Sequence, residues 1–396
     1  MNQDSSPRER FYSLDILRGI AALSVVFWHW DHFFFVGTKH RAYDIARLPL
    51  SEWLLVLYTK GWLAVDLFFS LSGFIFYWLY SRRVAEGVIT PGRFAWLRFS
   101  RLYPLHFTTL LVVGASQMWL INARGSYFVY PNNDGIHFLL NLFFASSWGI
   151  GPAYSLSFNG PIWSVSVEVL LYGLFFACCR LFPVRALLLG FVSITGFFVV
   201  EKYYSPIGRG IGSFFLGGCV FLAYQAITAS RRAIALTKWA GFLMLSAWLA
   251  TLVIVLYDVD LNLLSVRSVP FFWRFDAPFH WIMQKVPDRW PVMVLFPLTI
   301  LSLALIETHR GSLGKRLSFL GDISYSSYLL QFPLQLMFSV VVTRLAFTDS
   351  VYYSPWFMGL FFAVLILSSL GSYRYFEVPA QRFLRHMTFH RSSGHL

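Results

Sequence analysis

Arg18 and His29 are the first two residues of this sequence whose types and spacing could do chemistry. Both interrupt the apolar run 13–36, and His29 lies eleven positions after Arg18. If that run is helical, about 100° per residue returns the two side chains to nearly the same face, about 16 Å apart along the axis. An anion held by Arg18 could extend an arm toward His29, which accepts protons near neutral pH. A snorkelling arginine and a structural histidine are the alternative reading.

Two further arginines, Arg98 and Arg101, stand three positions apart before the apolar run 102–121. On a helix this spacing places both guanidinium groups on one face. Paired guanidinium groups suit the recognition of phosphate. An ordinary cytoplasmic anchor for the following segment is the alternative.

Two acids lie inside apolar runs, where an ionised group is costly and marks a functional site by default. Glu168 follows Pro161 by about two helical turns. It needs a partner at that depth, either His29 or an unrelated basic residue. Asp66 precedes the small residues of the stretch 70–73, which allow close helix packing. It could orient a catalytic group, bind an acceptor, or form a structural pair.

The elements that must position these residues are membrane helices. Of the 396 residues, 57% are hydrophobic and only 13% are charged, about half the charge usual in soluble domains. The sequence predicts an all-α, polytopic integral membrane protein with about ten transmembrane helices. The apolar patch 137–145 is too short to span and suits an interfacial or re-entrant piece. The predicted spans are 14–36, 61–80, 102–121, 162–182, 185–200, 208–228, 236–257, 290–307, 323–345 and 355–376.

Lysine and arginine placement predicts a cytoplasmic N-terminus and C-terminus. With this orientation the whole net charge of +13 falls on the inner side. Basic residues in short loops also explain the pI of 9.7 without nucleic-acid binding. The first run is retained rather than cleaved, because it is long, carries ionisable residues and lacks a small-residue cleavage site. We expect one transmembrane domain, 1–382, and a short basic cytoplasmic tail, 383–396.

Five stretches, taken together and in order, resemble the acyltransferase-3 family of polytopic membrane acyltransferases. These proteins are mostly bacterial and modify exported or surface carbohydrates, and sometimes small molecules. The resemblance covers nearly the whole chain. The matching stretches are Arg18 with His29, "VDLFF-x-LSGF" at 65–74, Arg98 with Arg101, "Pro-x-Trp-Ser-x-Ser-x-Glu" at 161–168, and "LG-x-ISYSxYL" at 320–329.

Two departures from the family pattern concern detail. The family commonly has a histidine shortly after the late "SYxxYL" stretch, where this chain has Gln331. A proton-transfer role at this position therefore does not carry over, although an amide still donates and accepts hydrogen bonds. The residues after Glu168 also differ from the frequent Glu-Gln-Phe-Tyr continuation, which leaves the substrate open.

The resemblance implies transfer of an acyl group, with acetyl expected, from cytosolic acyl-CoA to a hydroxyl of a surface or exported carbohydrate or lipid-linked glycan. It implies acyl-CoA as co-substrate, no metal, and a multi-pass protein of the bacterial inner membrane. His29 would be the general base or carry the acyl group, and Glu168 would orient it. Arg18, Arg98 and Arg101 would hold the CoA phosphates, with Asp66 as a third candidate catalytic residue.

Two rival functions stay open at this stage. Intramembrane charged residues are also typical of a transporter or flippase for a glycolipid or an anionic solute, although the internal repeats common in carriers are missing from the sequence. A non-catalytic subunit with the same frame is the second rival. Outer segments 122–160 and 258–289 are rich in aromatic residues, which could stack on sugars or anchor the interface. Acceptor identity and oligomeric state are not readable from the sequence.

Overall fold

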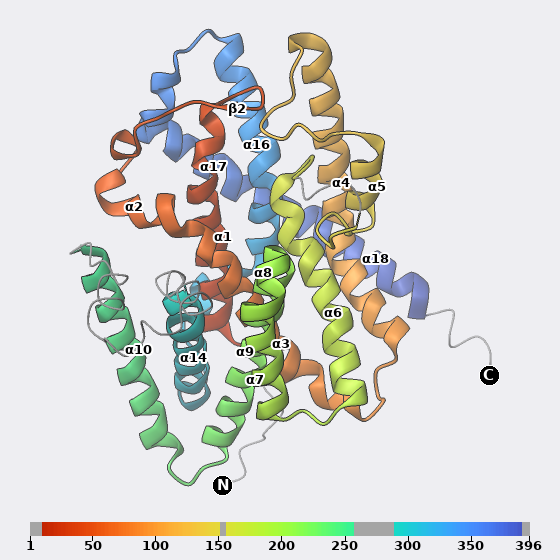
Figure 1. Ribbon diagram of the computed structural model, residues 1–396, viewed down its shortest axis with the longest axis vertical. Coiled ribbons are helices and arrows are strands. Elements are labelled where there is room, and N and C mark those ends of the chain that lie inside the picture. Colours follow the sequence, from red (N-terminus) through yellow and green to blue (C-terminus); the bar gives the residue numbers. More distant parts are fainter. Residues whose placement is uncertain (1–9, 151–155, 257–288, 390–396) are drawn as a thin grey trace, which may run out of the picture. The chain divides into compact units, whose positions relative to one another are not determined.

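The computed structural model describes residues 10–150, 156–256 and 289–389. Within these ranges, nine helical segments are long and apolar enough to cross a membrane (Figure 1). Helix α1 (Tyr12–Trp28) is a shorter tenth, prolonged by the 3-10 turn η1 (His29–Phe34). Each of the ten predicted spans therefore contains a helix, which confirms the all-α, polytopic architecture. The strands of the described residues are one short antiparallel pair, β1 (Phe35–Val36) and β2 (Lys39–His40).

The chain divides into two compact units, and the first comprises Met1–Arg18, Leu63–Ser81 and Val184–Leu320. In this unit α7 packs along α9, and α10 lies beside α14. Helix α3 crosses α9 so closely that a Cβ on Gly73 would lie 1.9 Å from the carbonyl oxygen of Phe214. The helices are α3 (Ala64–Ala85), α7 (Ala186–Thr195), α8 (Glu201–Tyr203), α9 (Ser205–Thr228), α10 (Ala233–Leu256), α14 (Phe296–Arg310) and α15 (Phe319–Asp322), of which α3 and α15 run past the unit's limits.

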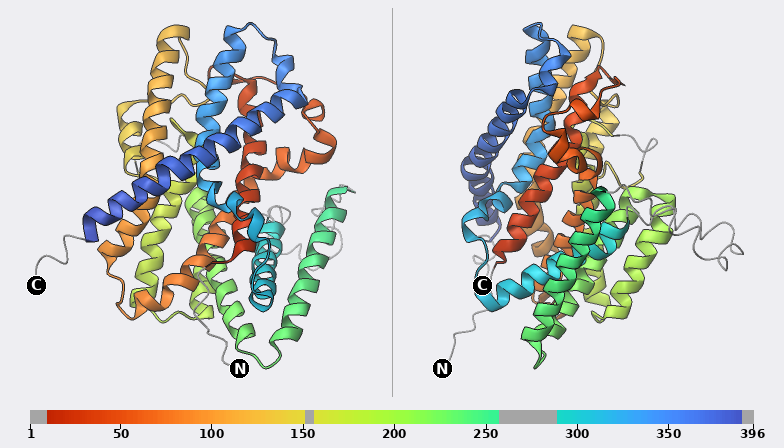
Figure 2. Two further views of the ribbon diagram at one scale, coloured as in Figure 1. Left: turned by 180° about the vertical axis from the view of Figure 1, so that it is seen from behind. Right: turned by 90° about the vertical axis from the view of Figure 1, so that its left-hand side faces the viewer.

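The second unit comprises Gly19–Trp62, Arg82–Pro183 and Gly321–Leu396. Here α17, the π-helical turn η10 (Tyr373–Glu377) and α18 follow one another as a long helix that packs on α16 and α4. This diagonal crossing is visible in Figure 2, left. The helices are α2 (Ser51–Lys60), α4 (Pro91–Arg124), α5 (Gly135–Leu142), α6 (Trp163–Leu181), α16 (Ser324–Arg344), α17 (Pro355–Ser372) and α18 (Val378–Phe389).

Helix α4 begins well before the apolar run that predicted it. The side chain of Thr90 accepts a hydrogen bond from the backbone N–H of Arg93, and Pro91 follows as the first helical residue. Both are favoured at helix starts, because the threonine satisfies a free N–H and proline needs none. Arg98 and Arg101 therefore lie inside α4, one turn apart. At the other end of the chain, α18 continues to Phe389, so residues 383–389 of the predicted tail are helical.

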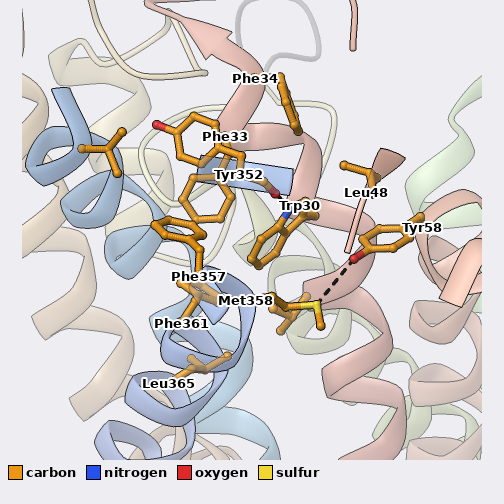
Figure 3. Close-up of a cluster of buried hydrophobic side chains, with 12 residues drawn as sticks. Trp30, Phe33, Phe34, Leu48, Tyr58, Tyr352, Phe357, Met358, Phe361 and Leu365 are labelled. Atoms are coloured by element: carbon orange, nitrogen blue, oxygen red, sulfur yellow. Dashed lines mark hydrogen bonds between the residues drawn. The ribbon is translucent and has the colours of Figure 1, made fainter. Parts of the chain in front are cut away.

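An aromatic cluster anchors η1, the turn that carries His29. Trp30 is completely buried, and its indole N–H donates to the carbonyl of Tyr352 over 3.1 Å. Figure 3 shows Trp30 and Phe33 packed against Phe357 and Phe361. Buried aromatic side chains of this size dominate local packing energy. The cluster therefore fixes one side of η1 and leaves its polar side chains on the other.

Candidate active site

His29 stands where α1 tightens into the 3-10 turn η1. Its ring stacks on that of His32, with 4.7 Å between ring centroids and 29° between the planes. A 3-10 turn brings residues three apart onto one side, and this places the two imidazoles face to face. The predicted base is therefore accompanied by a second histidine from the same turn.

A hydrogen-bond network fixes His32. Gln335 of α16 lies 2.8 Å from His32 Nδ1 through its Oε1, and its Nε2 donates to the carbonyl of His29 over 2.7 Å. A carbonyl can only accept, so the amide orientation is set and His32 Nδ1 must carry the proton. His32 Nε2 lies 3.2 Å from the hydroxyl of Tyr130. Both ring nitrogens of His32 therefore have hydrogen-bond partners.

Tyr130 is itself placed by a tight turn. Val129 adopts a left-handed backbone with φ of 60°, and the N–H of Tyr130 donates to the carbonyl of Phe128 over 2.7 Å. This geometry is costly for a β-branched residue. The side chain of Gln117 holds the turn by bonding both backbone groups of Phe128, at 2.8 and 2.9 Å. Gly160 packs directly against the Tyr130 ring, because a Cβ at this position would lie only 2.2 Å from it.

The ring of His29 is not satisfied in the same way. Its Nδ1 is buried and has no hydrogen-bond partner among the residues that the structure describes, and the same holds for Asp31 Oδ1 and Gln331 Oε1. Both side chains lie close enough to interact with His29, Asp31 through its charge and Gln331 through its amide. Buried polar atoms without partners are costly and rare. Three such atoms, one of them in the imidazole itself, mark His29 as a candidate for chemistry.

Glu168 belongs to a second polar cluster of the same unit. It accepts a hydrogen bond from the hydroxyl of Tyr172, one turn along α6, and Arg98 and Arg101 act on this tyrosine electrostatically. Arg101 also acts on Glu377. The structure therefore places Glu168, through Tyr172, near the two predicted phosphate-binding arginines. Its pairing with His29 remains a prediction.

Asp66 forms a structural pair within the first unit. It is 1% exposed, and Arg209 of α9 approaches its carboxylate to 2.5 Å, with Ser213 Oγ at 3.1 Å. One turn further along α3, Ser70 Oγ donates to the carbonyl of Ser213 over 3.1 Å. The stretch 65–74 thus joins α3 to α9, which is the structural role considered for Asp66. A catalytic role for it remains a prediction.

Arg18 lies on α1, in the first unit. Its guanidinium is 3.8 Å from Asp15, and 29% of its side chain is exposed. Glu307, completely buried, caps the start of the same helix by accepting from the N–H groups of Tyr12 and Ser13, at 3.0 and 2.8 Å. A carboxylate at a helix start satisfies free donors and opposes the helix dipole.

Residues of the stretch 161–168 form hydrogen bonds that hold α6 against neighbouring segments. Ser164 Oγ lies 2.7 Å from the hydroxyl of Tyr328, which donates to the carbonyl of Pro161 over 2.7 Å. Ser166 Oγ donates to the carbonyl of Phe144 over 2.6 Å. These bonds join α6 to α16, the helix that bonds to the turn of His29, and to the segment after α5.

Sequence reasoning missed five residues of the clusters around His29 and Glu168. They are His32, Tyr130, Tyr172, Gln335 and Glu377. Of these, Gln335 carried a usable signal, because it stands one helical turn after Gln331 in an apolar run. The predicted outer loop 258–288 and residues 151–155 lie outside the described residues. Among the described residues, no group of three or more His, Cys, Asp or Glu side chains is placed to hold a metal ion.

Comparison with known proteins identifies the family of this chain. The model of an acyltransferase domain, that of the acyltransferase-3 family, matches residues 11–373. The chain therefore belongs to the acyltransferase-3 family. No solved structure gives a significant match.

Two curated relatives share part of this sequence. "Protein 2 in picA locus" of Rhizobium radiobacter is 43% identical over 110 residues, which are 28% of this chain and 47% of the relative. "Acyltransferase MdmB" of Streptomyces mycarofaciens is 34% identical over 186 residues, 45% of this chain and 42% of the relative. The chain thus spans less than half the length of each curated relative that it matches.

Proposed function

We propose that this protein is a membrane O-acyltransferase that moves an acyl group, acetyl by expectation, from cytosolic acyl-CoA to a hydroxyl of an exported or surface carbohydrate. The observation that carries the proposal is the state of His29. Its backbone and its stacked neighbour are held by buried hydrogen bonds, while its own Nδ1 is buried with no partner among the described residues. A fixed histidine whose two ring nitrogens are not both bonded by the described residues, unlike those of His32, suits proton transfer to a bound substrate. Membership of an acyltransferase family supports the same reaction class.

In the proposed reaction, the acceptor hydroxyl gives its proton to His29 while its oxygen attacks the thioester carbonyl carbon. The tetrahedral intermediate collapses, the carbon–sulfur bond breaks, and the departing CoA thiolate takes the proton back from His29. The products are the acyl ester and free CoA. Transfer through an acyl-histidine is the alternative, in which His29 attacks the thioester first and the acceptor hydroxyl attacks the acyl-imidazole afterwards.

Binding of the donor is assigned to the arginines. Arg98 and Arg101 stand one turn apart on α4, and Arg101 is exposed. Guanidinium groups at this spacing suit the phosphates of CoA. Arg18, eleven positions before His29, is the third proposed phosphate ligand. Glu168 and Asp66 stay proposed as supporting catalytic groups, to be tested after His29.

The identity of the acceptor and the location in the bacterial inner membrane are proposed from the family resemblance. A surface or exported carbohydrate, or a lipid-linked glycan, would supply the hydroxyl, and the bacterial inner membrane would hold the protein. One relative is named only as an acyltransferase, which supports the reaction class.

The test is acyl-CoA turnover by purified protein in detergent, with a surface-glycan extract as acceptor and release of the free CoA thiol as readout. We expect His29→Ala to lower kcat by about 100-fold or more, the range for a lost general base. Arg18→Ala is expected to raise KM for acyl-CoA. His309→Ala is the matched control, because that histidine bonds to Thr237 in the first unit and has no assigned role.

Three results would contradict the proposal. Turnover that is indifferent to His29→Ala would remove the base assignment and move it to Glu168 or Asp66. Turnover equal with and without the acceptor extract would exclude transfer to a glycan. Folded protein that neither binds nor consumes acyl-CoA would instead favour a transporter or flippase.

A further inference from the structure

Two fully buried glutamines on α16, Gln331 and Gln335, face the turn that carries His29. They stand one helical turn apart and therefore share a face of the helix. Gln335 uses both ends of its amide, one on the His29 carbonyl and one on His32. Because it binds the backbone of His29, it fixes where the imidazole is attached. Gln335 does not bond the ring of His29, so another group must determine which way the imidazole nitrogens point.

Gln331 is placed to set that direction. Its Nε2 donates to the carbonyl of Tyr328 over 3.1 Å. This bond fixes the amide, so Oε1 is the atom left for the His29 ring, with which Gln331 interacts. Gln331 Oε1 and His29 Nδ1 are both buried and both lack a hydrogen bond within the described part of the chain. One is an acceptor, and the other becomes a donor in one tautomer of a neutral imidazole.

The two atoms are not bonded in the structure, and a hydrogen bond between them requires the proton on Nδ1. His29 Nε2 then holds the lone pair and is the nitrogen that meets the acceptor hydroxyl. Leaving both atoms unpaired would cost each its full desolvation penalty. The charged and titratable neighbours of His29 are Asp31 and His32 on its own turn. Tyr130 and His40 reach His32 in turn.

We propose that Gln331 is a positioning residue that orients His29 through its side-chain oxygen and makes Nε2 the base. The inference rests on the proposed role of His29 and assigns to a neutral amide the task that a carboxylate performs in a catalytic triad. An amide fixes the tautomer without adding negative charge beside the imidazole. The same turn of α16 would then support His29 twice, through its backbone by Gln335 and through its ring by Gln331.

The experiment compares Gln331→Met and Gln331→Glu with wild type, using CoA release as a function of pH. Methionine keeps the shape of glutamine but lacks the strong acceptor, so we expect kcat to fall by about 10 to 100-fold, the range for a lost bond to a functional histidine. KM for acyl-CoA should stay within about twofold, because binding of the donor does not use this group. Gln225→Glu, the same chemical change at an exposed position of α9, is the control for added charge.

Gln331→Glu gives a readout that a purely structural role would not move. A carboxylate beside His29 favours the protonated ring, and the base is active only when unprotonated. The acidic limb of the kcat profile should therefore move to higher pH by about one unit or more. Glutamate is nearly isosteric with glutamine, so this variant decides the question if the methionine variant fails to fold.

The proposal is overturned if folded Gln331→Glu shows the wild-type profile and kcat while His29→Ala is inactive. That result would leave His29 as the base and remove only its orientation by Gln331. If His29→Ala itself keeps full activity, the proposed function fails at its base, whatever the Gln331 variants do. Equal profile shifts in Gln225→Glu and Gln331→Glu would also overturn the proposal, because they would mean a general effect of charge.

Discussion

Gly73→Ala tests whether the stretch 65–74 is a packing motif. The new Cβ would lie 1.9 Å from the carbonyl oxygen of Phe214 on α9, whereas a carbon–oxygen contact is normally about 3.3 Å or longer. The helices must therefore separate by about 1.4 Å at this point. Overpacking of a well-packed contact costs about 1 to 3 kcal/mol. The upper end applies here, because a backbone oxygen cannot rotate away.

The structure also predicts how a second substitution combines with the first. Gly217 of α9 meets the same crossing from the other side, and its Cβ would lie 2.0 Å from the carbonyl oxygen of Ser70. Once Gly73→Ala has separated the helices, most of the room that Gly217→Ala needs is already open. The double variant should therefore lose less stability than the two single losses combined, by about 1 to 2 kcal/mol.

The assay is the unfolding midpoint in mixed detergent and SDS, followed by tryptophan fluorescence. Gly173→Ala in α6 is the matched control, because a Cβ there meets nothing within 4 Å. It should be neutral or gain up to about 1 kcal/mol of helix propensity. Equal midpoints for Gly73→Ala and Gly173→Ala would refute the reasoning, as would strictly additive losses in the double variant.

Three further predictions concern single groups. Asp66→Asn leaves its arginine partner on α9 as a buried charge without its counter-ion, so the free energy of unfolding should fall by about 3 to 5 kcal/mol; the same SDS titration measures this, and an unchanged midpoint would contradict it. Gly160→Ala would push aside the ring of Tyr130, and we expect kcat for CoA release to fall by about tenfold with KM unchanged. The backbone N–H of His137 lowers the pKa of the Asp134 carboxyl at the start of α5. Its cap is therefore complete above the ordinary aspartate pKa of about 3.9 and is lost as the pH falls through the lowered value. Hydrogen exchange in the first turn of α5 should quicken in that range relative to intrinsic rates, and Asp134→Ala should remove the dependence.

The helices were predictable because a membrane span is recognised from the apolar residues of its own segment, without knowledge of its neighbours in the fold. A span needs about 20 apolar residues whatever lies beside it. Helix starts follow another rule, as α4 shows. Its first turn is set by the cap of Thr90 and by Pro91, outside the apolar run, so the predicted start was eleven residues late.

Site residues were predictable only where the residue type is unusual for its own segment, such as an ionisable residue in an apolar run. His29 stands out in an apolar run, but the arginine partner of Asp66 depends on which helix packs against α3, and local spacing does not encode this. Gln331 drew notice as a departure from the family pattern. Gln335 carries no charge and drew none, although two amides one turn apart in a spanning segment indicate an interhelical hydrogen-bonding face.

The hydrogen bond between His32 and Gln335 has a consequence for how the protein is made. Its two residues are 303 positions apart in the chain. At about 5 to 20 residues per second, synthesis of α16 follows that of η1 by on the order of 15 to 60 s. During that interval His32 is in the membrane before its partner Gln335 has been made. An ionisable group without its partner in the membrane costs a few kcal/mol. Substitutions in α16 should therefore reduce how many molecules are correctly inserted, as well as how fast each one works. Yield and specific activity need to be measured separately for every variant of that helix.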